Sequence, residues 1–443
     1  MSDYLDLVEA QLSELTEKGA HQRLRARRPA LGGGGAGGDG PRPPRRRTEV
    51  LAFLAAAAVV AAVVAIVLVN AHHSTPTHAN ASSAGLGATH STTTHTSTSR
   101  TTPSVATPGK PPGGSVSTVI PAKFAPQSFT AISELTWWVL GPSPCMFAGG
   151  KPPCGSILRT TDGGRHFIGI PSPHASLSSD PNQPGYSQIR FADGTNGFAF
   201  GPGLWATHDG GETWKSVDPG GSVTDLAISD GEAYAIVDVS STGAAGGRLM
   251  HSPVSSDGWT AVSAAGNVSG GLWVQGSDVI AQSGVGNGIG SDVLVSHDAG
   301  ASFASYPSPT AGLGCQYQEP VPPVVWAHCA TGTESGVWRS TDGAAQFASA
   351  LPSAGVSLPN SAPFAAASDT TAVVGYQQLY RTDDDGHSYT PVGPKAVVAW
   401  AYLGFTDSTH GVGLGYVGSV SAANERLYYT TDGGQSYHLV PMP

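Results

Sequence analysis

The stretch Thr160-Thr-Asp162-Gly-Gly-Arg-His-Phe167 decides the fold, because variants of it return along the C-terminal three quarters of the chain. Its frame is a small hydroxyl residue, any residue, aspartate, any residue, glycine, two residues and an aromatic. The motif aspartates, including a degenerate copy at Asp257, lie 41 to 48 residues apart: Asp162, Asp209, Asp257, Asp298, Asp342, Asp384 and Asp432. Such periods are typical of four-stranded propeller blades, whose faces stay exposed until neighbouring sheets stack on them. The repeats therefore predict an all-β, seven-bladed β-propeller over residues 121–443.

Each motif copy is expected to form the turn of a hairpin. The aspartate carboxylate can accept N–H bonds of its own turn, and glycine supplies a positive φ without steric cost. A large apolar residue stands four positions before the aspartate in six copies: Leu158, Trp205, Leu294, Trp338, Tyr380 and Tyr428. The position after it is mixed, so the alternation indicates a strand with one buried face. The seven aspartates are therefore predicted to be structural.

In these residues the chain resembles the bacterial neuraminidase repeat, or Asp-box, family of propellers. A second element precedes the box by about one strand, as Phe191-Ala-Asp193-Gly-Thr-Asn-Gly197 and Phe405-Thr-Asp407-Ser-Thr-His-Gly411. With that element the chain looks like the seven-bladed photosystem II stability and assembly factor-like subgroup. The resemblance implies the fold of the sialidase-like superfamily, in which Asp boxes occur in hydrolases, sorting receptors and assembly factors alike.

Loop lengths predict two unequal faces of the propeller. Turns between first and second strands are short, and so are the Asp-box turns, so we call their side the short-turn face. Longer excursions fall between second and third strands, at 141–155, 240–247, 283–291 and 415–424. Their side is the long-loop face. Binding residues usually lie on loops that a rigid scaffold displays, so we expect the partner site there.

Ahead of the propeller the chain changes character three times. Residues 1–48 predict a short amphipathic helix followed by a basic tether of Gly, Pro and Arg. Residues 49–70 contain the unbroken apolar run 50–69, long enough to span a bilayer as a single transmembrane signal-anchor. Residues 71–120 read as a disordered stalk rich in Ser, Thr, His and Pro.

The arginines set the expected orientation of that anchor. Eight arginines precede the apolar run, and neither Lys nor Arg occurs between His72 and Ser99. The positive-inside rule then predicts a cytoplasmic N-terminus and a propeller outside the plasma membrane of a bacterium. Residues 1–48 carry nine basic and six acidic side chains, whereas the remainder carries 13 and 26. An acidic ectodomain with scattered basic residues argues against a nucleic-acid partner.

The four cysteines form two pairs that are close in sequence. Cys315 and Cys329 are symmetric about residue 322, within the turn Pro320-Val-Pro-Pro323, and would face each other across two antiparallel strands. Cys145 and Cys154 bracket a loop rich in Gly and Pro. An even count in an exported domain favours two disulfides, and neither pair has the spacing of a zinc site.

The acidic residues in or near loops are the candidates for catalysis: Asp238, Asp292, Glu319, Glu334 and Glu425. None has a sequence neighbour that would mark it as an acid of raised pKa, and Arg159, Arg339 and Arg381 recur at one repeat position, which argues for a structural role. We therefore predict no catalytic, cofactor-binding or metal-binding residue. The leading hypothesis is a non-enzymatic platform that recognises or assembles an envelope protein or a cell-wall glycan. The alternative is a glycoside hydrolase, glycosidase or sialidase-like, on the same fold.

Overall fold

The computed structural model describes residues 118–443, except positions 146, 148, 181–182, 240–245, 286–287 and 352–355. The predicted cytoplasmic helix and tether, the apolar run 50–69 and the stalk up to residue 117 lie outside the described residues. Among the residues described, no helix is both long and apolar enough to cross a membrane.

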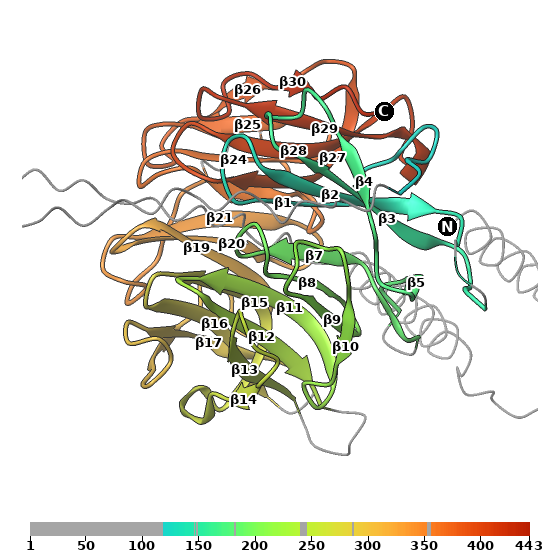
Figure 1. The fold of residues 1–443 in the computed structure, drawn as a ribbon. Helices are drawn as coiled ribbons and strands as arrows, with labels where there is room; N and C mark the ends of the chain where they lie inside the picture. The colour runs from blue at the N-terminus through green and yellow to red at the C-terminus, as the bar shows by residue number, and fades with distance from the viewer. Residues whose placement is uncertain are drawn as a thin grey trace, which may run out of the picture. The chain divides into compact units, whose positions relative to one another are not determined.

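The described chain is built from antiparallel meanders of short strands (Figure 1). The first sheet contains β1 (Ser128–Ala131), β2 (Trp137–Ser143), β3 (Cys154–Thr160) and β4 (Ile168–Ile170), extended by β5 (Ser176–Leu177) and β6 (Gly185–Tyr186). The next contains β7 (Gln188–Phe191), β8 (Gly197–Phe200), β9 (Leu204–Thr207) and β10 (Lys215–Val217). These last four strands agree with the strands that the sequence predicts between residues 188 and 217.

An eight-stranded sheet follows. It begins with the meander β11 (Ser222–Ser229), β12 (Glu232–Asp238), β13 (Gly247–Pro253) and β14 (Thr260–Ala261). After the 3₁₀ turn η2 (Ser263–Ala265) it continues with β15 (Asn267–Gln275), β16 (Asp278–Val285), β17 (Gly288–Ser296) and β18 (Ala304–Pro307). The two meanders are joined where the start of β13 pairs with the start of β15.

Three more four-stranded sheets complete the described chain. They are β19 (Cys315–Val321), β20 (Val324–Ala330), β21 (Ser335–Ser340) and β22 (Ala348–Ser349); then β23 (Phe364–Ala366), β24 (Ala372–Gly375), β25 (Leu379–Thr382) and β26 (Thr390–Val392); and finally β27 (Val397–Phe405), β28 (Gly411–Val417), β29 (Glu425–Thr430) and β30 (His438–Leu439). A 3₁₀ turn, η3 (Ala422–Asn424), precedes β29.

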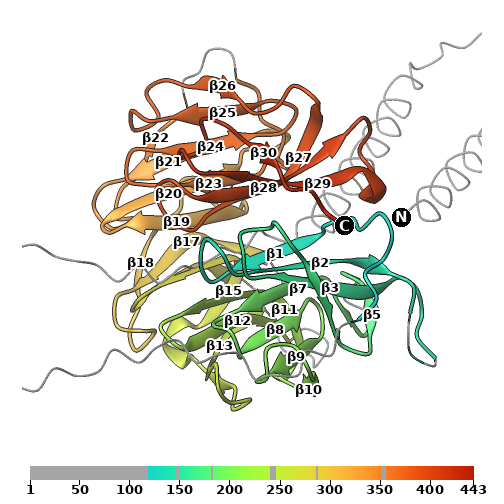
Figure 2. The same ribbon diagram turned by 45° about the horizontal axis from the view of Figure 1, so that its top comes forward.

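The core lies between neighbouring sheets. Trp138 and Leu140 of the first sheet pack against Ile189 of the second, and each later pair of neighbours shares a similar buried cluster. The last sheet packs on the first, because Leu414 and Leu427 share a cluster with Phe129. Figures 1 and 2 show these two sheets side by side. Sheets that stack face to face in succession and return to the first are the arrangement of a β-propeller, so that part of the prediction is confirmed.

Polar side chains join the first strands of successive meanders. These strands lie next to one another without a shared ladder, so their N–H groups need other acceptors. Ser128 Oγ accepts from the N–H of Ile189 at 3.1 Å, and Asp225 Oδ2 accepts from the N–H of Leu272 at 2.9 Å. The same device recurs at the buried Gln318, whose Oε1 accepts from the N–H of Ala366 at 2.6 Å.

The long-loop face differs from the prediction at two places. Residues 283–291 do not form an excursion, because β16 and β17 pair through Val285 and Gly288 as one long hairpin with a bulge near Gly284. Glycine within a strand allows the neighbouring strand to approach closely. The glycine-rich composition of this segment had instead led to the prediction of a loop. The second difference is the parallel pair β5 and β6, which the repeat pattern does not predict.

Candidate functional site

Six of the motif aspartates share one hydrogen-bond geometry on the short-turn face. In the second copy Thr207 Oγ1 donates to Asp209 Oδ1 at 2.8 Å and accepts from the N–H of Gly211 at 2.9 Å. The N–H of Thr213 donates to the same carboxylate oxygen at 2.8 Å. The corresponding hydroxyl-to-carboxylate bonds occur at Asp162, Asp298, Asp342, Asp384 and Asp432. Each carboxylate is therefore engaged within its own turn.

These hydrogen bonds also hold the box carboxylates in the ionised form. The side-chain hydroxyl of Ser388, followed by its N–H, lowers the pKa of Asp384 to about 2. Ser302 does the same for Asp298, whose pKa also falls to about 2. A carboxylate with such a low pKa is a poor general acid or base near neutral pH.

Asp257 has different partners. Its carboxylate accepts from Lys215 Nζ at 2.8 Å and from His208 Nε2 at 3.3 Å, both in the preceding sheet. Trp259 stands two positions after the aspartate, where five of the other copies carry glycine and one carries Ala344, so the frame of the box is not kept. Asp257 thus joins two sheets, whereas the sequence prediction placed it within a turn of the Asp-box type.

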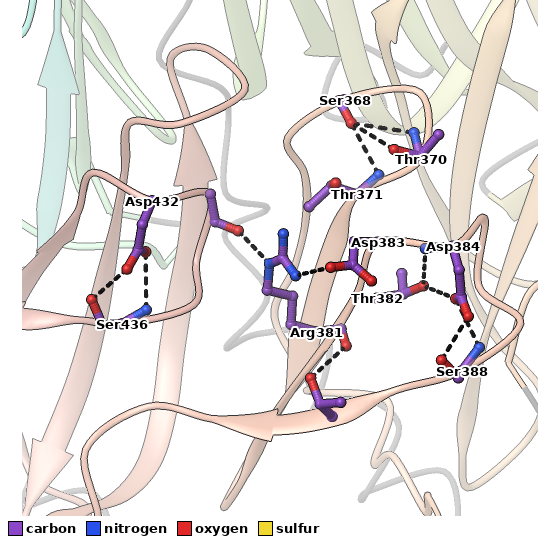
Figure 3. Close-up of polar contacts among 12 residues, drawn as sticks. Ser368, Thr370, Thr371, Arg381, Thr382, Asp383, Asp384, Ser388, Asp432 and Ser436 are labelled. Carbon is purple, nitrogen blue, oxygen red and sulfur yellow. Dashed lines mark hydrogen bonds and ion pairs between the residues drawn. The ribbon is translucent and has the colours of Figure 1, made fainter.

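The three recurring arginines also reach the following sheet. Figure 3 shows Arg381, whose Nε donates to the carbonyl of Gly433 at 2.8 Å while Nη1 pairs with Asp383 at 2.7 Å. Arg339 Nε donates to the carbonyl of Asp369 at 2.8 Å and also pairs with Asp385. A Cβ added at Gly210 would lie 3.6 Å from Arg159 Nη1. The arginines lie one per sheet and do not gather around one carboxylate-binding site.

A group of possible metal ligands lies where the first and last sheets meet. Ligand atoms of Glu134, Asp407 and His410 are within 4.8 Å of one another. His410 Nδ1 lies 2.8 Å from Asp407 Oδ2, and its Nε2 lies 3.8 Å from Glu134 Oε1. The sequence could not bring these residues together, because they belong to opposite ends of the propeller. Their contacts with one another help to join the two sheets.

The short-turn face also holds a pocket of about 100 Å³ at the ends of β1, β7 and β11. Arg190 and residues 228–231 contribute to its lining. The Arg190 guanidinium donates to the carbonyl of Ile189 at 2.7 Å and lies over the ring of Phe200. This volume is well below the roughly 300 Å³ at which small-molecule sites begin.

Two segments of the long-loop face lie beside the first sheet, and we call the described residues within 141–155 and 171–187 the crest. The disulfide Cys145–Cys154 closes its first loop. Ser176 Oγ donates to the carbonyl of Lys151 at 2.9 Å, and the rings of Phe147 and His174 stack with centroids 4.9 Å apart. The contacts of His174 and Ser176 therefore support the loop that the disulfide closes.

The other predicted disulfide is also present. Cys315 and Cys329 are directly opposite in the ladder of β19 and β20 and are bonded to each other. The symmetry of the two cysteines about a proline turn was sufficient to predict this pairing.

The acidic candidates differ from the expectation at two positions. Burial raises the pKa of Glu319 to about 7, with a further rise from Asp278, and burial raises the pKa of Glu425 to about 8. The sequence neighbours of these two residues do not indicate the raised pKa values, because burial in the fold is their main cause. Asp292 and Glu334 accept hydrogen bonds from nearby serines, Ser305 and Ser357.

The sheets together define a β-propeller in which six motif carboxylates are hydrogen-bonded within their own turns. No protein-family model matches the chain, and no curated protein matches it in sequence. Among solved structures it is similar to YCF48 bound to D1 peptide, with 18% identity and a TM-score of 0.46 over 71% of this chain and 95% of that one. It is also similar to YCF48 from Cyanidioschyzon merolae, with 14% identity and a TM-score of 0.40 over 57% and 84%.

A third similar structure is a Mycobacterium tuberculosis puromycin-hydrolyzing peptidase. It shares 12% identity with a TM-score of 0.52, covering 72% of this chain and 53% of that one. At such identities the likeness concerns the fold alone.

Proposed function

We propose that the protein is a non-enzymatic platform that recognises a partner, an envelope protein or a cell-wall glycan, through the long-loop face. The crest carries this proposal. A disulfide, a cross-segment hydrogen bond and a stacked ring pair fix its loops before any partner arrives. Loops that are already ordered lose less conformational entropy on binding, so the affinity per contact is higher.

We further propose that the propeller has seven blades. The proposal is supported by the box repeats and by the meanders β1–β4, β7–β10, β11–β14, β15–β18, β19–β22, β23–β26 and β27–β30. On this view the eight-stranded sheet is two blades joined by the short pairing of β13 with β15.

The proposed placement is a single-pass protein of the bacterial plasma membrane with the propeller outside. Residues 50–69 would form the anchor and residues 71–120 the stalk that holds the platform away from the bilayer. The support is the length of the apolar run together with the arginines on its N-terminal flank.

The alternative, a glycoside hydrolase, has one observation in its favour. A glycosidase needs an acid of raised pKa, and Glu425 on the long-loop face is such a group. Turnover of a β-glucan or a sialoside that Glu425→Gln abolishes would favour this alternative over the platform.

The crest gives the sharper test of the platform. In the full-length protein, Cys145→Ser with Cys154→Ser should free the first loop and weaken capture of the native partner, cross-linked in intact cells, by about tenfold without abolishing it. Asp209→Ala on the opposite face is the matched control and should capture normally. Unchanged capture by the cysteine variant, or lost capture by the control, would contradict the proposal.

A further inference from the structure

Two side chains of the last sheet lie opposite each other on the long-loop face, beside a loop of the neighbouring sheet. Glu425 opens β29, and Tyr416 stands directly opposite it near the end of β28. Tyr376 follows β24 in the neighbouring sheet, and its carbonyl accepts from the N–H of Trp400 at 2.8 Å. That bond holds the Tyr376 loop against the last sheet. The group belongs to the scaffold and does not depend on the crest.

The Glu425 carboxyl is buried but unpaired. Only 7% of the residue is exposed, and in the described part of the chain its carboxyl oxygens accept no hydrogen bond. The carboxyl of Glu319 is likewise without a partner, but both of its oxygens are fully enclosed. The oxygens of Glu425 are not among these fully enclosed atoms, so they keep some exposure at the long-loop face.

The neighbouring charges leave this carboxyl without a counterion. The Arg426 guanidinium is turned away, since its Nη1 donates to the carbonyls of Ala423 at 3.0 Å and of Glu425 itself at 2.8 Å. The titratable group that faces it is the hydroxyl of Tyr416, its cross-strand partner, and Tyr376 in turn interacts with Tyr416. Burial and then Glu425 and Tyr376 raise the pKa of Tyr416, so the hydroxyl stays neutral. Ionisation of Glu425 therefore lacks a compensating positive charge.

A cation is the ligand that satisfies this arrangement best. A buried carboxylate without a partner is costly, and an ammonium group supplies a positive charge and three donors. Tyrosines can add hydroxyl acceptors and ring faces that attract a cation. A sugar hydroxyl supplies neither the charge nor the same number of donors.

We propose that Glu425, with Tyr416, forms a binding site for a primary ammonium group, such as a lysine side chain of the protein partner. This inference rests on the proposed function in that the partner presents the lysine to the long-loop face. It narrows the partner to a protein with a basic residue at the contact.

The test uses the full-length protein in detergent and two probes of equal shape. Nα-acetyl-lysine N-methylamide carries the ammonium, and the norleucine analogue lacks it. Saturation-transfer NMR should show saturable binding of the lysine probe and about tenfold weaker binding of the norleucine probe. The lysine affinity should rise with pH towards pH 8, because binding requires the ionised carboxyl.

Variants decide whether the site is the one assigned. Glu425→Gln should lower the lysine-probe affinity about tenfold or more, and Tyr416→Phe should also lower it while leaving the carboxyl in place. Glu334→Gln, which changes an exposed carboxylate on the same face, should bind as the wild type does. Equal binding of the two probes, no saturable binding, or wild-type affinity in Glu425→Gln would overturn the assignment.

Two further results separate this site from the platform itself. Binding of N-acetylglucosamine that requires Glu425, in place of the lysine probe, would replace the amine site by a glycan site and also overturn the assignment. If the lysine probe fails while the crest variant still weakens partner capture, the ammonium site is wrong and the platform stands.

Discussion

The Asp209 carboxylate accepts hydrogen bonds from two hydroxyls and one N–H of its own turn. The bond from the hydroxyl two positions before the aspartate and the bond from the N–H four positions after it recur in five other turns. A free aspartate in a surface turn would contribute little to stability. Here the carboxylate accepts from the hydroxyl of Thr207 and from both the hydroxyl and the N–H of Thr213, and each such bond stabilises the turn by about 0.5–1.5 kcal/mol. Hydrogen bonds within the turn are sufficient to explain the recurring motif, so the motif gives little information about ligands.

Asp209→Ala should therefore destabilise the propeller by about 1–3 kcal/mol, because the turn loses the acceptor of its N–H groups. Chemical denaturation measures this change. Glu212→Ala removes the same charge from the same turn without removing such an acceptor, and it should leave the denaturation midpoint nearly unchanged. Equal effects of the two substitutions would show that charge, and not the turn, is responsible.

The buried carboxyl of Glu319 predicts a folding stability that decreases as pH rises, opposite to the pH dependence expected for the box aspartates. Its folded pKa of about 7 lies above its ordinary value of 4.5, so between these values the unfolded chain releases a proton that the folded chain keeps. The free energy of unfolding therefore falls as pH rises through this window. Glu319→Gln should remove that contribution, so its stability relative to the wild type should increase from about pH 4 to about pH 8.

Denaturation midpoints at both pH values measure the Glu319 effect, with Glu334→Gln as the exposed control. A constant difference between Glu319→Gln and the wild type would count against the buried, unpaired carboxyl. The box aspartates act at lower pH. Their lowered pKa values mean that the stability they supply is present above their ordinary pKa and is lost as pH falls towards about 2.

At the scale of elements, side chains on the first strands of neighbouring sheets make the hydrogen bonds between sheets that a shared β-ladder would otherwise provide. The Gln318 amide accepts from the N–H of Ala366 and donates to the carbonyl of Phe364 at 3.3 Å, linking β19 to β23. Gln318→Leu keeps most of the side-chain volume but leaves both backbone groups unpaired in a buried setting.

Gln318→Leu is expected to cost about 2 to 5 kcal/mol, since each unpaired buried group costs roughly 1–3 kcal/mol with partial relief by relaxation. Thermal or chemical unfolding of the full chain gives the value. Gln346→Leu, an exposed glutamine in a box turn, should change stability by less than about 0.5 kcal/mol. A cost as small as that of the control would mean that the inter-sheet bonds contribute little.

The repeat pattern predicted those elements that local chemistry determines. The box turns, the strands β7–β10 and the pairing of Cys315 with Cys329 all follow from residues within one meander. The sequence could not predict the burial of Glu319 and Glu425, because neighbouring sheets and loops distant in the chain cover them. The hairpin at 283–291 was missed because its glycines and serines suit a loop and a close strand approach equally well.

At the scale of the whole molecule, the ring closes without exchange of a strand. The first and last sheets are each built from one end of the described chain, and they meet through apolar packing and the contact between His410 and Glu134. The chain enters at the first sheet, where Thr118 pairs with Gly169 beside β4. A stalk that joins the rim in this way would leave the long-loop face free to meet a partner.

The orientation of the whole chain follows from its charges and can be tested directly. If the arginines on the flank hold the N-terminus inside, the stalk is outside and trypsin added to intact cells should cut after Arg100. The product should be a soluble fragment of residues 101–443, detected through a C-terminal tag. Arg100→Gln is the matched control and should reduce that product.

A second variant tests the cause of the orientation. Replacing the arginines at 42 and 45–47 by glutamate should scramble the topology, because these are four of the eight flanking arginines and lie nearest the apolar run. Part of the protein would then resist trypsin until the cells are permeabilised. Resistance of the wild-type protein in intact cells, with cleavage only after permeabilisation, would place the propeller inside and overturn both the orientation and an extracellular partner.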